Sequence, residues 1–276
     1  MKALNEPIPP MTVPSHTQFF ALHTQPSPLL LPNAWDAASA ALFQRAGARA
    51  VATSSAALAW SLGYADGSTL PRQELLAAVA RIQRVLSVPL SVDLEDGYSD
   101  CARQVADLVV DLAHLGVAGI NLEDGAQPPH LLVEKLAACR RALGENALFI
   151  NARTDVYLRG LASGEAALDL TVKRAQAYHV AGADGLFVPG LSRIEDAAFI
   201  AAHTAMPLNL MLLPELPSIA ALFAAGVRRF SAGPANFLLA YGHTFTATAA
   251  LLEAQHAQGM FAGSALDYAE VNALFS

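Results

Sequence analysis

Short apolar runs alternate with longer stretches of helical periodicity between about residue 28 and residue 240 of the chain. The stretches 37–47, 73–86, 101–116 and 165–182 have apolar residues three and four positions apart, and most of them end at glycine, as helices do. This alternation is typical of βα units built around a parallel sheet. We count eight apolar runs and predict a strand in each: LLLPNAWD (29–36), AVATSSA (50–56), PLSVDLED (89–96), AGINLED (118–124), LFINARTD (148–155), GLFVPG (185–190), PLNLMLLP (207–214) and RRFSAGP (228–234).

Eight strands joined by helices fit a closed barrel better than an open doubly wound sheet. An open sheet of that kind carries a glycine-rich phosphate motif after its first strand, and neither GxGxxG nor GxxxxGK(S/T) occurs here. We therefore predict an α/β fold, a single (β/α)8 barrel of the TIM type, for residues 1–276. It includes a loose N-terminal arm at about 1–15 and a helical C-terminal extension at about 236–276. The alanine-rich tail 251–275 is expected to pack on the barrel or on a neighbour.

Composition narrows the class of function. The chain has 276 residues, 54% of them hydrophobic and 15% charged, which is enough to bury a large core. Its net charge of −7 and its lack of a Lys/Arg run argue against nucleic acid or an anionic membrane as a partner. Residues 230–252 carry no charged side chain, but Gly233-Pro234, Asn236 and Gly242 interrupt them. We therefore predict a strand, a turn and a buried helix there, not a membrane span.

The cysteines and the N-terminus bear on location. Cys101 and Cys139 form no CxxC motif and have no histidine-rich surroundings, so neither a disulfide framework nor a zinc site is predicted. The first residues, MKALNEPIPPMTVPSH, lack the apolar core of a signal peptide. Both observations predict a cytoplasmic protein, and the charge pattern predicts one that acts on small molecules.

Carboxylates recur where apolar runs break into glycine turns, in SVDLEDGYSD (91–100) and GINLEDG (119–125). Asp93 and Glu95 share one face of the chain, and Glu123 ends the next run in the same way. Such acidic groups repel one another unless a cation lies among them, which favours a divalent-metal site. Alternatively, the pairs 95–96 and 123–124 are helix N-terminal carboxylates favoured by the helix dipole. The coincidence of two such sites disfavours that alternative.

In a barrel of this type, the groups that carry the chemistry lie at the carboxyl ends of the strands. One arginine there, Arg153, faces several carboxylates, which predicts a site for an anion and a metal ion together. Lysine occurs only at Lys2, Lys135 and Lys173, none at a strand end, which disfavours a Schiff-base aldolase. No GxSxG motif supports a serine hydrolase. The residues at predicted strand ends are Asn33, Trp35, Asp36, Ser54, Ser55, Asp93, Glu95, Glu123, Arg153, Asn209 and Ser231.

Four motifs occur in a familiar order: LGYADG (62–67), SVDLEDGY (91–98), GVAGINLEDG (116–125) and FINARTD (149–155). With them, the chain resembles the isocitrate lyase/phosphoenolpyruvate mutase superfamily from about residue 30 to residue 235. The resemblance implies a (β/α)8 barrel and dependence on Mg²⁺, with Mn²⁺ as an alternative ion. It also implies that a 2-oxo acid or its enolate is bound through carboxylate and carbonyl oxygens.

The resemblance assigns roles to the carboxylates. It implies that Asp93 contacts the metal ion and that Asp66, Glu95 and Glu123 hold the metal's water shell. Family members usually have aspartate where this chain has Glu95. The additional methylene is expected to shift a water-mediated contact without abolishing it.

On the substrate side, Ser54 and the backbone amides of Ser55 and Ala56 match the family loop that binds the substrate carboxylate. Arg153 matches the arginine that stabilises the developing enolate. Trp35 is explained equally well by packing in the wall. The predicted catalytic residues are Arg153 and Asp66, and the predicted substrate-binding residues are Ser54, Ser55, Ala56, Trp35, Asp93, Arg153 and Asn209.

Two departures from the family pattern bear on the reaction. Lyases of the family carry a Lys-Lys-Cys-Gly-His-type lid whose cysteine takes part in proton transfer, whereas GAQPPHLLVEKL (125–136) has no cysteine and no gate-like lysine. The sixth predicted strand ends in Pro189-Gly190, where mutases have histidine and several lyases have glutamate. Because the usual acid is missing, we predict poor cleavage of isocitrate and 2-methylisocitrate. His130 is the first substitute to consider, although isolated loop histidines are mostly solvated bystanders.

Together these observations predict a Mg²⁺-dependent carbon–carbon lyase that acts on a small 2-oxo acid or dicarboxylate, by retro-aldol cleavage or decarboxylation through an enolate. The missing acid favours oxaloacetate-type or malate-type substrates. Two alternatives stay open: phosphorus–carbon chemistry like that of phosphonopyruvate hydrolase or the mutases, and a 2-oxo acid binding protein without catalysis. The resemblance also implies a tetramer, with a dimer as the alternative, in which subunits exchange the last barrel helix. The apolar stretch 237–252 would be exposed on a monomer.

Overall fold

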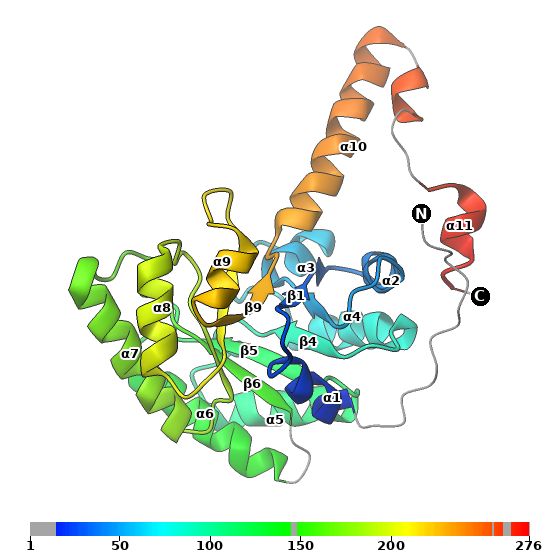
Figure 1. Ribbon diagram of the computed structural model, residues 1–276. Coiled ribbons are helices and arrows are strands. Elements are labelled where there is room, and N and C mark those ends of the chain that lie inside the picture. The colour runs from blue at the N-terminus through cyan, green and yellow to red at the C-terminus, as the bar shows by residue number, and fades with distance from the viewer. Residues whose placement is uncertain (1–14, 145–147, 256, 262–265, 276) are drawn as a thin grey trace.

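The computed structural model describes residues 15–144, 148–255, 257–261 and 266–275, and these form nine strands that pair in parallel (Figure 1). Each of the eight predicted runs contains a strand, and the first run holds two, so the predicted (β/α)8 barrel is confirmed. The strands are β1 (Leu29–Leu31), β2 (Asn33–Ala34), β3 (Val51–Thr53), β4 (Leu90–Asp93), β5 (Gly119–Glu123), β6 (Phe149–Arg153), β7 (Gly185–Phe187), β8 (Leu208–Met211) and β9 (Val227–Ser231).

The barrel closes through its first apolar run. β1 pairs with β9 and β2 pairs with β3, and only Pro32 separates β1 from β2. Proline has no backbone N–H and therefore interrupts the ladder. The carbonyl of Pro32 still accepts a hydrogen bond of 3.0 Å from the amide of Ala52, and the carbonyl of Leu31 accepts one of 3.0 Å from Ala232. One interrupted strand thus joins the two ends of the sheet.

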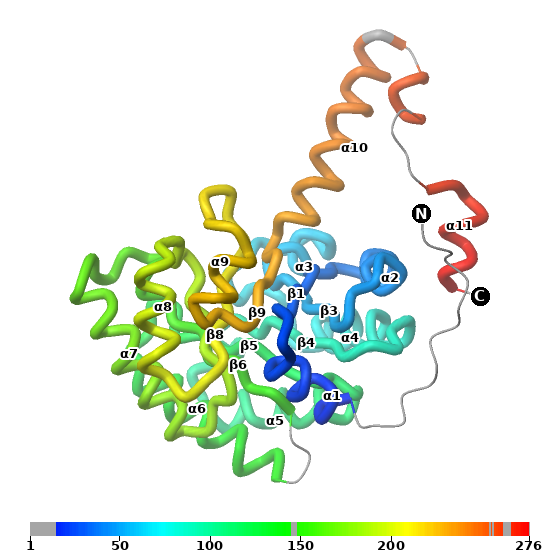
Figure 2. The backbone as a smooth tube through the Cα atoms, in the orientation of Figure 1, coloured from blue at the N-terminus to red at the C-terminus, as the bar shows by residue number. Residues whose placement is uncertain are grey.

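Helices alternate with the strands around the outside of the barrel (Figure 2). The four predicted helices are confirmed as α2, α4, α5 and α7, with small differences at their ends. In α5, Val105, Leu108, Val109 and Leu112 are buried at the predicted spacing. The helices are α1 (Ser15–Leu22), α2 (Ala37–Arg45), α3 (Ser55–Ser61), α4 (Arg72–Val85), α5 (Ala102–His114), α6 (Pro129–Leu143), α7 (Gly164–Val180), α8 (Ile194–His203), α9 (Ile219–Ala224), α10 (Ala235–Ala254), the 3-10 helix η1 (Ala257–Met260) and α11 (Tyr268–Asn272).

The prediction of a buried helix within 230–252 is wrong for the single chain. Figure 1 shows α10 standing away from the barrel, and Leu239 and Phe245 are 62% and 76% exposed. The base of α10 packs on the barrel, where Phe237 meets Trp35 with ring centroids 5.3 Å apart. Leu238, Leu239, Phe245 and Leu252 are exposed because α10 projects beyond the barrel.

α1 closes the amino-terminal end of the barrel. Phe19 is fully buried and meets Phe149 edge to face, with ring centroids 5.6 Å apart. A ligand can therefore enter from the opposite end, where the strands finish. The predicted arm at about 1–15 lies outside the described residues except for Ser15, which begins α1.

The helices and the cysteines bear on where the protein is located. Of the helices in the described part of the chain, none combines the length and the apolar character needed to cross a bilayer. Both cysteines are free, with Cys101 exposed and Cys139 buried. The cytoplasmic location stays a prediction.

Candidate active site

A small cavity lies at the carboxyl ends of the barrel strands. Its volume is about 150 Å³, below the ~300 Å³ at which pockets for drug-sized ligands begin. The cavity therefore suits a ligand of only a few heavy atoms. It is lined by Asn33, Ser54, Ser55, Ala56, Asp66, Asp93, Asn121, Arg153, Phe187, Met211, Ser231, Gly233 and Pro234.

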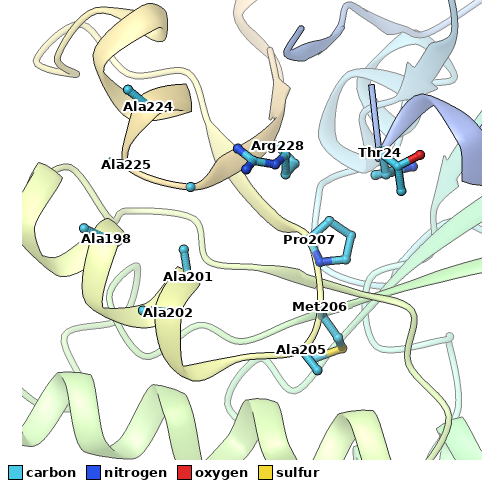
Figure 3. A pocket seen from close by; sticks show the side chains of 12 residues that line it. Thr24, Ala198, Ala201, Ala202, Ala205, Met206, Pro207, Ala224, Ala225 and Arg228 are labelled. Atoms are coloured by element: carbon cyan, nitrogen blue, oxygen red, sulfur yellow. The ribbon is translucent and has the colours of Figure 1, made fainter. Parts of the chain in front are cut away.

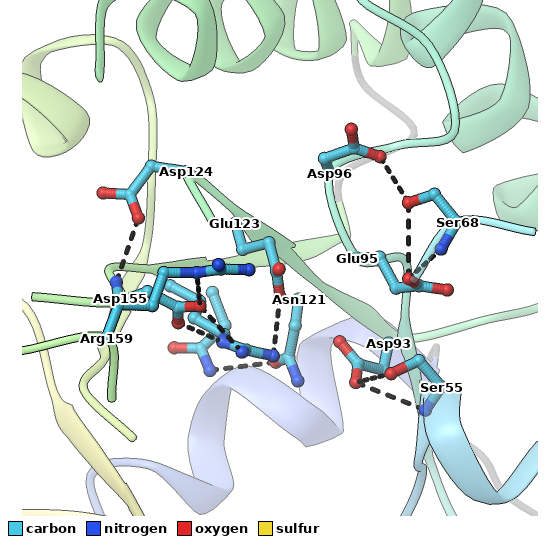
Figure 4. A network of polar contacts seen from close by, with 12 residues as sticks. Ser55, Ser68, Asp93, Glu95, Asp96, Asn121, Glu123, Asp124, Asp155 and Arg159 are labelled. Atoms are coloured by element: carbon cyan, nitrogen blue, oxygen red, sulfur yellow. Dashed lines mark hydrogen bonds and ion pairs between the residues drawn. The ribbon is translucent and has the colours of Figure 1, made fainter. Parts of the chain in front are cut away.

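Asp93, the last residue of β4, presents a buried carboxylate to this cavity. Its Oδ2 accepts hydrogen bonds from the Ser55 hydroxyl at 2.9 Å and from the Ser55 amide at 3.3 Å (Figure 4). Ser55 is held in place because Ser54 caps α3, its hydroxyl accepting from the amide of Ala57 at 3.3 Å. Oδ1 of Asp93 is buried and has no hydrogen-bond partner in the described part of the chain. That oxygen is available to a cation or a ligand.

The turn after β4 holds Glu95 in a strained backbone conformation. Glu95 has a φ of +50° and Tyr98 a φ of +59°, left-handed values that cost roughly 1–3 kcal/mol each in non-glycine residues. The Glu95 carboxylate accepts hydrogen bonds from the amide and the hydroxyl of Ser68 (Figure 4). These contacts tie the loop that bears Asp66 to the loop that bears Glu95.

Arg153, the last residue of β6, is fixed by carboxylates on two sides. Its Nε and Nη2 donate to the two oxygens of Asp155 at 2.7 and 3.1 Å, and Nη1 lies 2.6 Å from Oε2 of Glu123. Its guanidinium carbon lies 5.8 Å from the centre of the Phe187 ring. A planar fork that two carboxylates hold is preorganised to bind an anion.

A buried network behind Arg153 holds Asp155 in place. The Asp155 amide donates to Oδ1 of Asp124 at 2.9 Å (Figure 4). Oδ2 of Asp124 accepts from Arg174 at 2.7 Å and from the hydroxyl of Tyr178 at 2.6 Å. Asp124 is therefore a structural support. The alternative that these acidic pairs are helix N-terminal carboxylates is wrong, because the first turns of α5 and α6 contain no acidic residue.

Burial and mutual repulsion raise the pKa of three carboxyl groups at the mouth. Desolvation raises the pKa of Glu123 to about 8; Arg153 opposes this rise, and Asp93 adds to it. Desolvation is also the largest cause of the raised pKa values of Asp66 and Glu95, and the charge of Asp93 raises both further. The anionic forms of these groups are therefore unfavourable until positive charge is supplied.

The donor set fits a hard divalent cation that keeps part of its water shell. Mg²⁺ prefers carboxylate oxygens, usually one or two, together with retained water. Asp93 offers one unpartnered buried oxygen. The charge of Asp93 raises the pKa values of Asp66, Glu95 and Glu123, so these three carboxyl groups lie near it. Among the residues that the structure describes, no three Asp, Glu, His or Cys side chains are placed to hold a metal ion together. Asp93 therefore provides the buried, unpartnered oxygen for a direct contact.

Most of the predicted site residues come together, but four do not line the cavity: Trp35, Asn209, Glu95 and Glu123. Trp35 packs against Phe237 and Phe43, with ring centroids 5.3 and 6.2 Å apart. Asn209 is fully buried, and its Oδ1 accepts a hydrogen bond of 3.1 Å from Ser231, which lines the cavity instead. The predicted residues that do line it are Ser54, Ser55, Ala56, Asp66, Asp93 and Arg153, with Glu95 and Glu123 beside them.

Asn33 and Ser231, which were predicted at strand ends, line the cavity, but Asn121, Phe187 and Met211 also line it and were not predicted. For Asn121 the sequence does hold a signal. It lies two positions before Glu123 in β5, so strand alternation places both side chains on the inner face. Phe187 and Met211 are apolar, and nothing in the pattern separates them from core residues.

The region of the family lid has a different form here. A short turn after Asp124 leads into α6, which begins at Pro129 and bears the exposed His130 in its first turn. His130 does not line the cavity. Gly190 has a φ of +82°, and a Cβ there would lie 2.8 Å from the backbone nitrogen of Leu158. A side chain at position 190 is therefore excluded, and neither segment brings an acid into the cavity.

A larger cavity of about 500 Å³ lies at the opposite end of the barrel (Figure 3). Its wall includes Pro207 and Gly226, which directly precede β8 and β9. Most of its other lining residues are alanines, and no carboxylate is among them. Since TIM-barrel chemistry is found at the carboxyl ends of the strands, we place the candidate active site at the smaller cavity.

The fold and the site define a TIM-type barrel protein with a small cavity, lined mostly by polar residues, at its carboxyl-end mouth. The family model for phosphoenolpyruvate phosphomutase matches residues 19–252. The chain therefore belongs to the isocitrate lyase/phosphoenolpyruvate mutase superfamily.

Individual relatives have diverse names. An uncharacterized protein of Mycobacterium tuberculosis is 38% identical over 220 residues, covering 78% of this chain and 81% of that protein. Oxaloacetate decarboxylase 2 of Pseudomonas fluorescens is 32% identical over 200 residues, covering 67% of this chain and 66% of that enzyme. Among solved structures, a Burkholderia cenocepacia protein named provisionally as a phosphonomutase has a TM-score of 0.80 and 38% identity, covering 87% of this chain and 99% of that one.

Proposed function

We propose that this protein is a Mg²⁺-dependent carbon–carbon lyase that acts on a small 2-oxo acid or dicarboxylate. One observation carries the proposal: a cavity of about 150 Å³ brings together the unpartnered Oδ1 of Asp93 and the fixed guanidinium of Arg153. Breaking a bond next to a carbonyl leaves negative charge on oxygen. A cation at Asp93 and the guanidinium of Arg153 would both stabilise that charge.

Among the protein's own side chains, Arg153 would stabilise the negative charge that develops on the substrate oxygen. Asp155 and Glu123 fix its orientation before substrate binds, so the guanidinium need not reorganise during the reaction. Ser54 and the backbone amides of Ser55 and Ala56 lie in the same cavity wall and would bind the substrate carboxylate. The wall thus supplies a binding group for each end of a small oxo acid.

A metal ion would be held directly by Asp93 and through water by Asp66, Glu95 and Glu123. When bound, Mg²⁺, or Mn²⁺ in its place, supplies Lewis-acid polarisation of the substrate carbonyl. Positive charge at this point would also relieve the repulsion that raises the pKa values of these carboxyl groups.

The cavity favours decarboxylation over aldol cleavage of the larger tricarboxylates. Its lining residues in the described part of the chain include no His, Lys or Cys that could exchange a proton with the substrate. Loss of CO₂ breaks the bond without a base that must first take a hydroxyl proton. The relatives named oxaloacetate decarboxylase support the same choice of substrate class.

Phosphorus–carbon chemistry is the second candidate, supported by the 38% identity to the protein named provisionally as a phosphonomutase. It would need cationic or histidine groups around the phosphoryl group, whereas Arg153 is the one basic residue among the cavity-lining side chains described. The third candidate is a 2-oxo acid binding protein without turnover, since the binding groups are present and the described segment 125–136 brings no lid acid into the cavity.

Turnover assays with Mg²⁺ on oxaloacetate, 2-methylmalate and phosphonopyruvate separate these candidates. We expect carbon–carbon cleavage products from at least one of the first two compounds. Inorganic phosphate or phosphoenolpyruvate from phosphonopyruvate, without cleavage of the other two compounds, would favour the second candidate. Tight binding of pyruvate without product from any compound would favour the third.

We also propose that the protein is a homo-oligomer, a tetramer or a dimer, in which α10 packs on a neighbouring barrel. Leu238, Leu239, Phe245 and Leu252 on α10 are 56–76% exposed in the single chain, and such apolar surface marks an interaction site.

Light scattering at micromolar concentration should give a mass above that of one 29.0 kDa chain. Phe245→Glu should shift the mass towards the monomer, whereas Glu253→Gln should not. A monomeric wild type would contradict this proposal.

A further inference from the structure

Asn121 lies beside Asp93, the proposed metal ligand, on the neighbouring strand of the barrel. In the parallel register, Asn121 of β5 is paired with Asp93 of β4 on one side and with Asn151 of β6 on the other. Asn121 is 3% exposed and lines the small cavity. The roles proposed above for the cavity residues leave this side chain unexplained.

Arg229 lies beneath it in the barrel interior. This β9 residue is 1% exposed, and its Nη2 lies 3.1 Å from Oδ1 of Asn121 and 3.4 Å from the hydroxyl of Ser91. Burial lowers the pKa of Arg229 to about 9, opposed by the charge of Asp93, so the group remains cationic at neutral pH. No carboxylate of the described chain is within ion-pair distance of it. A buried guanidinium without a contacting carboxylate is costly, which points to a role in the site.

The chemistry of arginine fixes the orientation of the Asn121 amide. A guanidinium has only donors, so the Asn121 atom that faces Arg229 must be the oxygen. Nδ2 of Asn151 donates to the same oxygen at 3.0 Å. With Oδ1 accepting two hydrogen bonds, Nδ2 is the polar atom that Asn121 has left for a ligand.

The neighbouring strand β7 carries a glycine where the Asn151 side chain needs room. Gly185 of β7 is the register partner of Asn151, and a Cβ at Gly185 would lie 2.6 Å from Oδ1 of Asn151. The missing side chain therefore makes room for Asn151, which in turn supports Asn121. The contacts form a continuous chain from Gly185 to the cavity wall.

We propose that Asn121 is a substrate-binding residue whose Nδ2 donates to an oxygen of the bound 2-oxo acid, and that Arg229 and Asn151 are positioning residues that fix its amide. The inference rests on the proposed function, because the ligand is the oxo acid. A fixed donor would favour ligands that place an acceptor oxygen at this depth and reject those that do not.

Two variants of Asn121 test the donor by calorimetric titration of pyruvate into the full chain with saturating Mg²⁺. Asn121→Asp keeps an acceptor for Arg229 and Asn151 but replaces the Nδ2 donor with an oxygen. Asn121→Leu has a similar shape and adds no charge, but it has no donor. We expect both to weaken pyruvate binding about ten- to hundred-fold, the effect of losing a hydrogen bond to a charged group. Asn121→Asp should unfold at or above the wild-type temperature, because its carboxylate pairs with Arg229.

Variants of Arg229 test the positioning role. Lysine is also donor-only, so Arg229→Lys should keep the amide orientation and most of the pyruvate affinity. Arg229→Met removes one of the two donors to the amide oxygen and leaves Asn151 alone to hold it, so binding should weaken by up to about tenfold, the effect of one hydrogen bond. Equal affinities in a folded Lys and a folded Met variant would overturn the positioning role.

The outcomes separate this inference from the proposed function. If Asn121→Asp binds pyruvate with wild-type affinity, Asn121 has a purely structural role. If Asn121→Leu binds pyruvate with wild-type affinity, the weaker binding of Asn121→Asp is caused by the added negative charge and not by the lost donor. Either result overturns the inference alone. If the wild-type protein does not bind pyruvate with Mg²⁺, the inference and the proposed function fail together.

Discussion

Replacing Arg153 by lysine should lower kcat/KM on the cleaved substrate by about 10²-fold or more, the cost of losing transition-state charge stabilisation. Arg153 holds Asp155 with two parallel hydrogen bonds and contacts Glu123 with a third nitrogen. A lysine ammonium is a point charge and cannot reproduce that planar fork. Steady-state kinetics and thermal unfolding of the same preparation should show a loss of rate that is larger than the loss of stability.

Arg159→Lys is the matched control. Arg159 also contacts Asp155, at 3.2 Å, but its side chain is 48% exposed and does not line the cavity. We expect kcat/KM close to that of the wild type. If Arg153→Lys likewise retained near-normal kcat/KM on the true substrate, Arg153 would have no role in charge stabilisation.

The second large effect should appear in metal binding. Asp93→Asn removes a formal charge from the residue whose Oδ1 is unpartnered, and Glu123→Gln removes one from the surrounding shell. Isothermal titration should give Mg²⁺ affinity lowered about 10–100-fold by Glu123→Gln, as for outer-shell changes, and lowered further by Asp93→Asn. The exposed Asp100, changed to asparagine, should leave the affinity unchanged. Unchanged affinity in both test variants would refute the metal assignment.

The pH dependence of the same titration gives an independent readout. Desolvation raises the pKa of Glu123 to about 8, so below that pH the metal-free protein carries a proton on this group. Mg²⁺ favours the deprotonated form, so its affinity should rise from about pH 6 to about pH 8. Glu123→Gln has no such proton to release and should flatten this rise.

Strand and helix periodicity was sufficient to predict the barrel, because every buried strand of a parallel barrel is a near-continuous apolar run. The interruption at Pro32 was not predicted, because LLLPNAWD was interpreted as one strand although the proline lies within it. The exposure of α10 was missed for a different reason. An apolar helix has the same pattern whether its own chain or a neighbouring subunit covers it.

The carboxylates and Arg153 could be predicted because charged side chains at the ends of apolar runs are conspicuous. Trp35 and Asn209 occupy strand-end positions as well, but the packing of Trp35 on Phe237 and the burial of Asn209 behind Ser231 depend on tertiary contacts. Asn121, by contrast, lines the cavity but was not predicted. A neutral side chain in the middle of a strand gives no charge signal, and its buried partner Arg229 comes from a strand more than a hundred residues away.

The proposed function is tested most directly by measuring pyruvate release from oxaloacetate by the wild-type protein with Mg²⁺ and with EDTA, corrected for the reaction without protein. The same preparation is assayed on isocitrate and 2-methylisocitrate. We expect Mg²⁺-dependent turnover of oxaloacetate within the ordinary range of about 1–10³ s⁻¹, and very weak or no cleavage of the two tricarboxylates. Turnover of either tricarboxylate in that range, with none of oxaloacetate, would contradict the assignment.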